Sequence, residues 1–522
     1  MKRTINWGGV LLGTLVLFST LVGRSFTALP ERDPDSLIYG YIGLRWLQGA
    51  IPYRDLWDHK PPGIFFVNAL AFHFWGKSFA ALAVIEAICM IGGAVTLYYL
   101  IRELGAPRSV AGYGVAALAL MANSLFYNEC GNLTEIYILW PAILSTYCFC
   151  RSLSMFRGKW MLAAGFFGGM AGLFKQPGFA PLLAEGLYLG LQAWLWRRMR
   201  TRDLLRSMGL GALGAFAVWL PFCVYFAAHH ALGYFVDACF AYAVRFGVSG
   251  QPASLMEFEK WFGTVNSIFA PVASVVVAAA VGVVFYGMRA QNTGGDPLAP
   301  DAKPEERRIF FWPLILCWLG FDLLGALAGG RNFPHYFLPI MPSLAVAAAF
   351  TIWALGDLAP SERRPQVAAA FGALILGPLL FTQVSDAHSM FDIFSYGAAR
   401  SPQQAVAEKL ASIRRPEDTL FEWDYYPEIY FASELGTPVR EMFAFEIYQF
   451  PNLDFRRRRG EQILRQIMKA PPTFVVDSPF TNGSLRVNDP TYQEFRKYVG
   501  ENYHLIYQAD DVALYTHLPP HL

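Results

Sequence analysis

The sequence predicts a polytopic α-helical membrane protein with a small α/β domain at its C-terminal end. Of its 522 residues, 54% are hydrophobic and only 16% are charged, whereas soluble domains carry roughly 25% charged residues. The mean hydropathy is +0.32. The last 130 or so residues are different, because short strand-like and helix-like patterns replace the long apolar runs there. The formal net charge of +2 gives no indication of a nucleic-acid partner.

Eleven apolar runs are candidate membrane spans, since a bilayer core of about 30 Å requires roughly 20 apolar residues per helix. The first follows Met-Lys-Arg and resembles a signal peptide in its basic start. No small-x-small cleavage site precedes the charged segment after it, so we expect an uncleaved anchor. The runs lie near 7–27, 79–101, 109–125, 133–150, 160–174, 178–196, 207–228, 266–287, 309–328, 336–355 and 366–385.

Basic residues alternate between the connecting loops and so predict the orientation of the spans. If Lys2 and Arg3 lie inside, every short loop assigned to the inside is basic, from Arg102 and Arg108 to Arg363 and Arg364. Cytoplasmic loops of membrane proteins carry such an excess of Lys and Arg. We therefore expect a cytoplasmic N-terminus, with 28–78, several short turns and the C-terminal segment outside.

The C-terminal segment predicts a separate domain. Four short stretches read as strands, and three longer ones, 402–414, 457–469 and 490–500, read as helices. The four strand-like stretches are "TLFEW", "TFVVD", "HLIYQ" and "VALYT". We place the boundary between a transmembrane domain, 1–385, and a C-terminal α/β domain, 386–522.

The first expected outer loop concentrates titratable side chains beside the membrane. Its sequence from residue 32 to residue 63 is "RDPDSLIYGYIGLRWLQGAIPYRDLWDHKPPG". Ser36 to Gln48 reads as a short helix that lies along the membrane surface. Asp33 and Asp35 sit at its N-terminus, where the helix dipole favours a carboxylate. From the local pattern alone, Asp35 is either a helix cap or a catalytic carboxylate.

A rigid segment follows in the same loop. Pro61-Pro62 excludes helix and fixes an extended backbone before it. Lys60 and His59 are thereby held at headgroup level, where a lysine can bind an anionic phosphate. The alternative is a juxtamembrane turn whose lysine meets bulk lipid.

Three segments resemble the GT-C superfamily of membrane glycosyltransferases, which includes protein O-mannosyltransferases and the aminoarabinose transferases of lipid A. The loop matches the family pattern through Asp35, Tyr39 or Tyr41, "GAIPYRD" and "DHKPP". "GGRNFPHYFLPIMPSLA", 329–345, resembles the family's glycine-arginine and His-Tyr segment. "NLTEIYILWPAIL" resembles the segment in which an acidic residue, here Glu135, opens an early span.

The resemblance implies a GT-C-type bundle of about eleven helices in the bacterial inner membrane. Its enzymes transfer one sugar, a hexose or pentose, from a polyprenyl-phosphate donor to an acceptor hydroxyl on the periplasmic face. Such an inverting displacement needs a general base, for which Asp35 is favoured; Asp33 remains open, because family members often show a paired Asp-Glu where this chain has Asp35-Ser36. The donor phosphate or sugar would contact Lys60, His59, Asp58, Arg331 and His335, and the acceptor or sugar would be oriented by Glu135, Tyr39, Tyr53 and Lys175.

Alternatives remain for several of these residues. Either histidine fits a structural role equally well, Glu135 fits a helix cap, and Lys175 fits a headgroup contact. No cofactor is indicated, and no ligand triad is evident, although the carboxylates and His59 leave a divalent cation open. The expected partners are the lipid-linked donor, membrane lipids and a glycan, lipid or protein acceptor. The main rival is a polytopic transporter or flippase of envelope lipid or glycan, which would carry charges near mid-membrane on broken helices.

Overall fold

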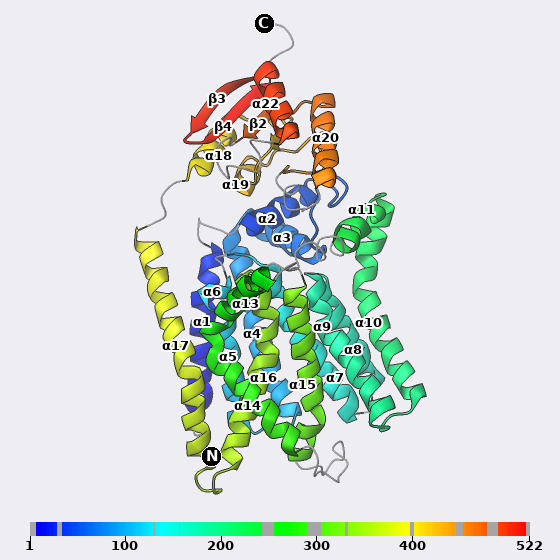
Figure 1. Cartoon of the computed structure of the whole chain (residues 1–522), viewed down its shortest axis with the longest axis vertical. Helices are drawn as coiled ribbons and strands as arrows, with labels where there is room; N and C mark the ends of the chain where they lie inside the picture. Colours follow the sequence, from blue (N-terminus) through cyan, green and yellow to red (C-terminus); the bar gives the residue numbers. More distant parts are fainter. Residues whose placement is uncertain are drawn as a thin grey trace. The chain divides into compact units, whose positions relative to one another are not determined.

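The structure is a computed structural model that describes most of the chain (Figure 1). The described ranges are 7–28, 34–128, 131–155, 157–242, 255–289, 304–328, 332–396, 401–444, 453–477 and 489–517. Two compact units share the chain. Unit 1 contains 1–29, 79–222 and 251–396, and unit 2 contains 30–78, 223–250 and 397–522. The first outer loop, assigned from the sequence to the transmembrane domain, thus groups with the C-terminal segment.

Unit 1 is a bundle of apolar helices. Eight helices are long and apolar enough to cross a membrane among the described residues. All eleven expected runs are helical, and three of them form the shorter helices α5, α8 and α9. The helices are α1 (Trp7–Ser25), α4 (Phe79–Glu103), α5 (Arg108–Ala122), α6 (Leu125–Asn128), α7 (Thr134–Met155), α8 (Gly158–Gly172), α9 (Ala180–Gly190), α10 (Thr201–Ala228, whose last turns belong to unit 2), α13 (Leu255–Phe269), α14 (Ala273–Arg289), α15 (Pro304–Leu327), α16 (Met341–Asp357) and α17 (Arg364–Tyr396).

Short helical turns connect several of these helices. They are η1 (Phe26–Ala28), η2 (Gln176–Phe179), η3 (Leu191–Leu195), η5 (Ala270–Val272) and η7 (Pro334–Ile340). The turns η2 and η7 matter most for the site, because they directly follow Lys175 and contain His335 respectively.

Small residues allow close helix packing in unit 1. A Cβ atom built on Gly165 of α8 would lie 2.0 Å from the Gly211 carbonyl oxygen of α10, and one on Gly214 would lie 2.1 Å from that of Leu162. Only glycine permits this approach. Helix association in membranes depends on such contacts, because burial of apolar surface from lipid provides no driving force.

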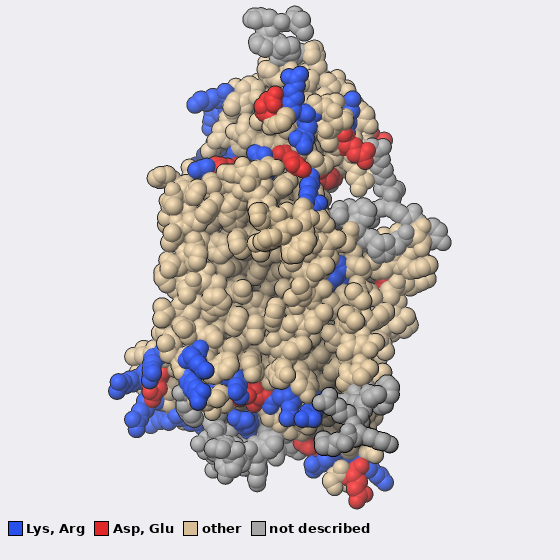
Figure 2. Space-filling model, turned by 180° about the vertical axis from the view of Figure 1, so that it is seen from behind, with Lys and Arg blue, Asp and Glu red and all other residues tan. Residues whose placement is uncertain are grey.

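Basic residues gather at one end of unit 1. The turn between α16 and α17 lies at the same end as the start of α1 (Figure 1). Figure 2 shows Lys and Arg side chains collected at this end, next to a broad belt with few charges. The distribution has the form that the positive-inside rule describes.

Unit 2 begins with two short helices, α2 (Pro34–Leu47) and α3 (Gly63–Trp75), joined by the Gly49–Pro62 segment. The helix expected near 36–48 is therefore present. At 14 residues, or about 21 Å, α2 is too short to cross a bilayer core. The segments α11 (Leu232–Val236) and η4 (Asp237–Ala241) also belong to this unit.

The C-terminal part of unit 2 contains a four-stranded sheet in the order β1-β2-β4-β3. β1 pairs with β2 in parallel, whereas β2 with β4 and β3 with β4 are antiparallel. All four strands and the three helices expected from the sequence are present. The elements are α18 (Pro402–Ile413), β1 (Leu420–Glu422), α19 (Pro427–Ser433), α20 (Leu453–Lys469), β2 (Phe474–Asp477), α22 (Pro490–Asn502), β3 (Tyr503–Ala509) and β4 (Val512–His517).

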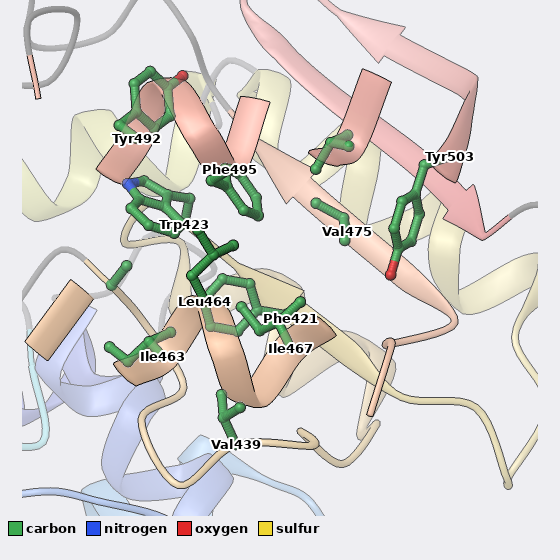
Figure 3. Packing of buried hydrophobic residues seen from close by; sticks show 12 residues of the cluster. Phe421, Trp423, Val439, Ile463, Leu464, Ile467, Val475, Tyr492, Phe495 and Tyr503 are labelled. Atoms are coloured by element: carbon green, nitrogen blue, oxygen red, sulfur yellow. The ribbon is translucent and has the colours of Figure 1, made fainter. Parts of the chain in front are cut away.

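Aromatic and aliphatic side chains from α20 and α22 fill the core against the sheet (Figure 3). Trp423, directly after β1, is fully buried, and its ring stacks on Phe495 of α22 with centroids 4.3 Å apart. Ile463 and Ile467, one turn apart on α20, complete the cluster. This core fixes the end of β1 and the chain that follows it.

Candidate functional site

The candidate base, Asp35, lies in the first turn of α2. Pro34 suits the first helical position, because its ring presets the backbone and its missing N–H is not needed there. One turn later, the Tyr39 hydroxyl donates a hydrogen bond to Asp35 Oδ2 over 2.9 Å. The side chain of Asp35 remains 32% exposed, so a small molecule can reach it.

Lys60 lies against this carboxylate. Its Nζ atom is 3.5 Å from Asp35 Oδ2, and its side chain is only 7% exposed. The same ammonium lies 5.5 Å from the centre of the Tyr39 ring, within the range of a cation–π contact. The structure therefore brings together three residues that the sequence assigned to one site.

The backbone around Lys60 is held from three directions. Its N–H donates to Asp58 Oδ1 over 2.7 Å. Its carbonyl oxygen accepts hydrogen bonds from the Tyr53 hydroxyl, at 2.8 Å, and from the Cys239 thiol, at 3.5 Å. Because both backbone groups are engaged, the ammonium is presented from a fixed position.

The sequence predicted that Tyr53 orients the acceptor or the sugar, but its side chain does not line the accessible part of the site. Its side chain is fully buried, and its hydroxyl bonds the Lys60 carbonyl. Its backbone adopts φ 69°, a left-handed conformation that is uncommon outside glycine. This turn directs the ring inward, where it packs on Phe226 and Phe235. Tyr53 therefore supports Lys60 from within the unit.

Asp58 and His59 flank the lysine. Burial raises the pKa of the Asp58 carboxyl to about 6, although Lys60 acts in the opposite direction. His59 Nε2 lies 3.2 Å from Lys60 Nζ, where a neutral imidazole can accept a hydrogen bond. The His59 ring also packs against Tyr242, with centroids 5.2 Å apart. Asp58 thus fixes the Lys60 backbone, while His59 lies close enough to share a ligand of the ammonium.

A second cluster lies in unit 1. Glu135, in the first turn of α7, forms an ion pair with Lys175 and is 2% exposed. The Thr134 hydroxyl donates to the other Glu135 oxygen over 2.7 Å. The Lys175 ammonium lies 3.4 Å from the centre of the Tyr336 ring. The neighbouring His335 is buried and acts electrostatically on Glu135.

In the sequence, Glu135 and His335 belong to two distant motifs and Lys175 to a turn outside both, and the structure joins them in one cluster. Lys175 has a carboxylate partner rather than only lipid headgroups around it. Two other candidates, Asp33 and Arg331, lie outside the described residues. Within the described ranges, no group of three or more His, Cys, Asp or Glu side chains is arranged to hold a metal ion.

One contact of Asp35 has no counterpart in the sequence motifs. The hydroxyl of Tyr425, which follows β1 in the C-terminal part of unit 2, donates to Asp35 Oδ1 over 3.0 Å. The two residues are 390 positions apart. No local sequence pattern signals such a pair.

Comparisons with known proteins agree with the motifs. A family model described as dolichyl-phosphate-mannose-protein mannosyltransferase matches residues 59–225. This range includes Lys60, Glu135 and Lys175 but not Asp35. No curated protein matches the chain.

The solved structures of ArnT from Cupriavidus metallidurans resemble the whole chain. For ArnT bound to undecaprenyl phosphate, the TM-score is 0.57 at 14% identity, and the alignment covers 99% of both chains. For the apo state, the TM-score is 0.58 at 14% identity, with 98% of this chain and 97% of the other covered. At this identity the likeness establishes a shared fold. That fold extends over both units, including the C-terminal segment.

Proposed function

We propose that this chain is a membrane glycosyltransferase of the GT-C class, which transfers one sugar from a polyprenyl-phosphate donor to an acceptor hydroxyl on the periplasmic face. The shared fold and the family model that matches residues 59–225 support this class. The contact between Asp35 and Lys60 carries this proposal. It brings into one site a carboxylate that can accept the acceptor proton and an ammonium that can bind the phosphate of the donor. The undecaprenyl phosphate bound to ArnT supports the choice of a polyprenyl-phosphate carrier.

Lys60 is the proposed phosphate ligand. The Lys60 side chain is only 7% exposed, and ion pairing is stronger in such a buried environment than in bulk water. As the bond between C1 of the sugar and the phosphate oxygen breaks, negative charge grows on the departing polyprenyl phosphate. Lys60 stabilises that charge, and His59 is near enough to contribute. Arg331 is assigned to the same phosphate from its motif alone.

Asp35 is the proposed general base. The acceptor oxygen forms a bond to C1 while its proton passes to Asp35, and the phosphate leaves from the opposite face, which inverts the anomeric centre. When the phosphate takes Lys60 as its partner, Asp35 Oδ2 is released from the ion pair and becomes available to accept the proton.

The unit 1 cluster is proposed to orient the acceptor or the sugar. Glu135, Lys175 and His335 combine a carboxylate, an ammonium and an imidazole around the Tyr336 ring. Sugar hydroxyls suit such a set, since they donate to carboxylates and accept from ammonium groups. Tyr39 is proposed to share this task from the other cluster.

The proposed setting is the bacterial inner membrane, with the N-terminus in the cytoplasm and the C-terminal domain in the periplasm. The charge distribution supports this orientation, because the basic residues of unit 1 gather at the end where α1 begins (Figures 1 and 2). A periplasmic reaction has no nucleotide sugar at hand, which suits a lipid-linked donor.

Mass spectrometry of envelope glycans and lipids from a deletion strain tests the proposal. The strain should lack one hexose or pentose from a single envelope component, and the wild-type gene should restore it. An Asp35→Asn gene expressed at the same level should not restore it. If the protein were a flippase, the Asp35→Asn gene should restore the missing sugar as the wild-type gene does. An unchanged envelope in the deletion strain would overturn the proposal.

A further inference from the structure

The C-terminal domain supplies a residue to the reaction centre: we propose that Tyr425 is a positioning residue for Asp35. This inference rests on the proposed function, since it concerns the same carboxylate. It also gives the C-terminal domain a part in the transfer, which no sequence motif indicates.

The hydrogen bonds of Asp35 divide between its two oxygens. Tyr39 and Lys60 both contact Oδ2, whereas the Tyr425 hydroxyl donates to Oδ1. Tyr39 is on the same helix as Asp35, one turn away, and so follows every movement of α2. Tyr425 comes from another part of the chain and fixes the rotation of the carboxylate relative to that part.

Tyr425 is itself held firmly in place. Its ring packs against Phe443, with centroids 5.1 Å apart, and Phe443 packs edge-on against Tyr430. On the N-terminal side, the Trp423 N–H donates to the Val476 carbonyl of β2 over 3.2 Å. On the C-terminal side, the Tyr426 N–H donates to Glu422 over 3.1 Å. The hydroxyl is therefore presented by the sheet and its core, not by a long loop.

The region after Tyr425 is docked on the helices that carry the site. The Tyr41 hydroxyl of α2 donates to the Leu435 carbonyl over 2.5 Å, and the Tyr41 ring contacts Tyr430. Lys77 forms an ion pair with Glu434 at 2.9 Å.

The Asp35-Lys60 segment has a contact of its own with this region. The Trp57 N–H, three residues before Lys60, donates to the Arg440 carbonyl over 2.9 Å. These contacts hold the first outer loop and the C-terminal domain in one compact unit, so the bond from Tyr425 to Asp35 is part of a continuous interface.

A hydrogen bond to an ionised carboxylate has two effects that a test can separate. It fixes the direction in which the second oxygen points, which affects turnover. It also favours the ionised form, which a base must have before it accepts a proton. Loss of the Tyr425 hydroxyl should therefore lower turnover and move the acidic limb of the pH–rate profile to higher pH.

The test compares Tyr425→Phe with Tyr41→Phe in the full-length protein. Each variant loses one phenol hydroxyl from the same interface and keeps its ring, but only Tyr425 touches Asp35. The assay follows release of undecaprenyl phosphate from undecaprenyl-phosphate mannose, with an envelope extract of the deletion strain as acceptor, between pH 4.5 and 8. Undecaprenyl phosphate binding and thermal stability are measured on the same samples.

We expect Tyr425→Phe to lower kcat about 10- to 100-fold, the usual effect of losing a hydrogen bond to a charged group, and to shift the acidic limb to higher pH. Carrier affinity should remain that of the wild type. Tyr41→Phe should leave the pH profile in place even if it lowers thermal stability. If the wild type is active and Tyr425→Phe has the same acidic limb, this inference is overturned while the proposed function stands. An unchanged envelope in the deletion strain counts against the proposed function itself.

Discussion

The ammonium of Lys60 lies 3.5 Å from the Oδ2 atom of Asp35. In the sequence, most of α2 and a turn separate the two residues, and Pro61-Pro62 follows directly after Lys60. Their contact therefore depends on the fold of the whole segment from α2 to α3. Hydrogen bonds from Tyr39 and Tyr425 orient the carboxylate. Hydrogen bonds from Tyr53 and Cys239 to the Lys60 carbonyl fix the backbone from which the ammonium extends.

Lys60→Met should weaken binding of undecaprenyl phosphate by about 10- to 100-fold, as expected when a phosphate loses one charged hydrogen-bond partner. Binding of the carrier to the purified protein, measured by microscale thermophoresis, checks this. Lys77→Met is the matched control, because Lys77 belongs to the same unit but pairs with Glu434. Equal affinities for the Lys60 and Lys77 variants would remove Lys60 from the phosphate site.

Asp58 makes stability depend on pH. Burial raises its pKa from 3.8 to about 6 in the folded protein, so the folded state binds the proton more tightly than the unfolded state does. Below about pH 4 the carboxyl is protonated in both states. As pH rises from 4 to 6, the unfolded state loses the proton before the folded state does, so the free energy of unfolding falls. Above pH 6, folding buries an ionised group, at a cost on the order of 2–3 kcal/mol.

Asp58→Asn should therefore raise the melting temperature at pH 7.5 and have little effect at pH 4. Asparagine keeps an oxygen that can accept the Lys60 N–H. Asp55→Asn is the opposite control: burial acts to raise the Asp55 pKa, but hydrogen bonds from Arg54 and from the Ile51 N–H lower it overall. Its loss should destabilise the protein at pH 7.5. If Asp58→Asn instead destabilises it at pH 7.5, the carboxylate form is the one that the fold requires.

The Glu135–Lys175 pair allows a structural role to be separated from a functional one. Lys175→Met alone leaves a carboxylate that is 2% exposed without its cation, and such changes typically cost about 3–5 kcal/mol. The double variant Glu135→Gln/Lys175→Met removes both charges, so its melting temperature should return to near the wild-type value. If the cluster orients acceptor or sugar, the double variant should still show a raised KM. If the double variant recovers both the melting temperature and the wild-type rate of transfer, the pair has a structural role only.

Local sequence patterns predicted much of this arrangement. Apolar runs identified the helices of unit 1, short strand-like stretches identified β1 to β4, and the Pro-Pro segment indicated that Lys60 is held rigidly in the first outer loop. Each of these features depends on neighbours in the chain. The pairing of Glu135 with Lys175 was not evident, because it depends on how α7 packs beside the turn at η2.

Two features were beyond local patterns for definite physical reasons. The hydroxyl of Tyr53 points inward because its backbone adopts a left-handed conformation. The local sequence "IPYRD" does not predict this conformation for a tyrosine. Tyr425 reaches Asp35 because the parallel pairing of β1 with β2 and the docking of the segment around Leu435 place it there. Long-range contacts of this kind are set by tertiary packing and not by a motif.

A comparison of Asp35→Asn with Asp33→Asn tests the central claim most directly, with transfer and undecaprenyl phosphate binding measured on the same purified samples. A lost general base lowers the rate by about 10²- to 10⁴-fold. Asp35→Asn should show this loss while it still binds the carrier through Lys60, and Asp33→Asn should transfer at close to the wild-type rate. Wild-type transfer by Asp35→Asn would contradict the assignment of this carboxylate as the base.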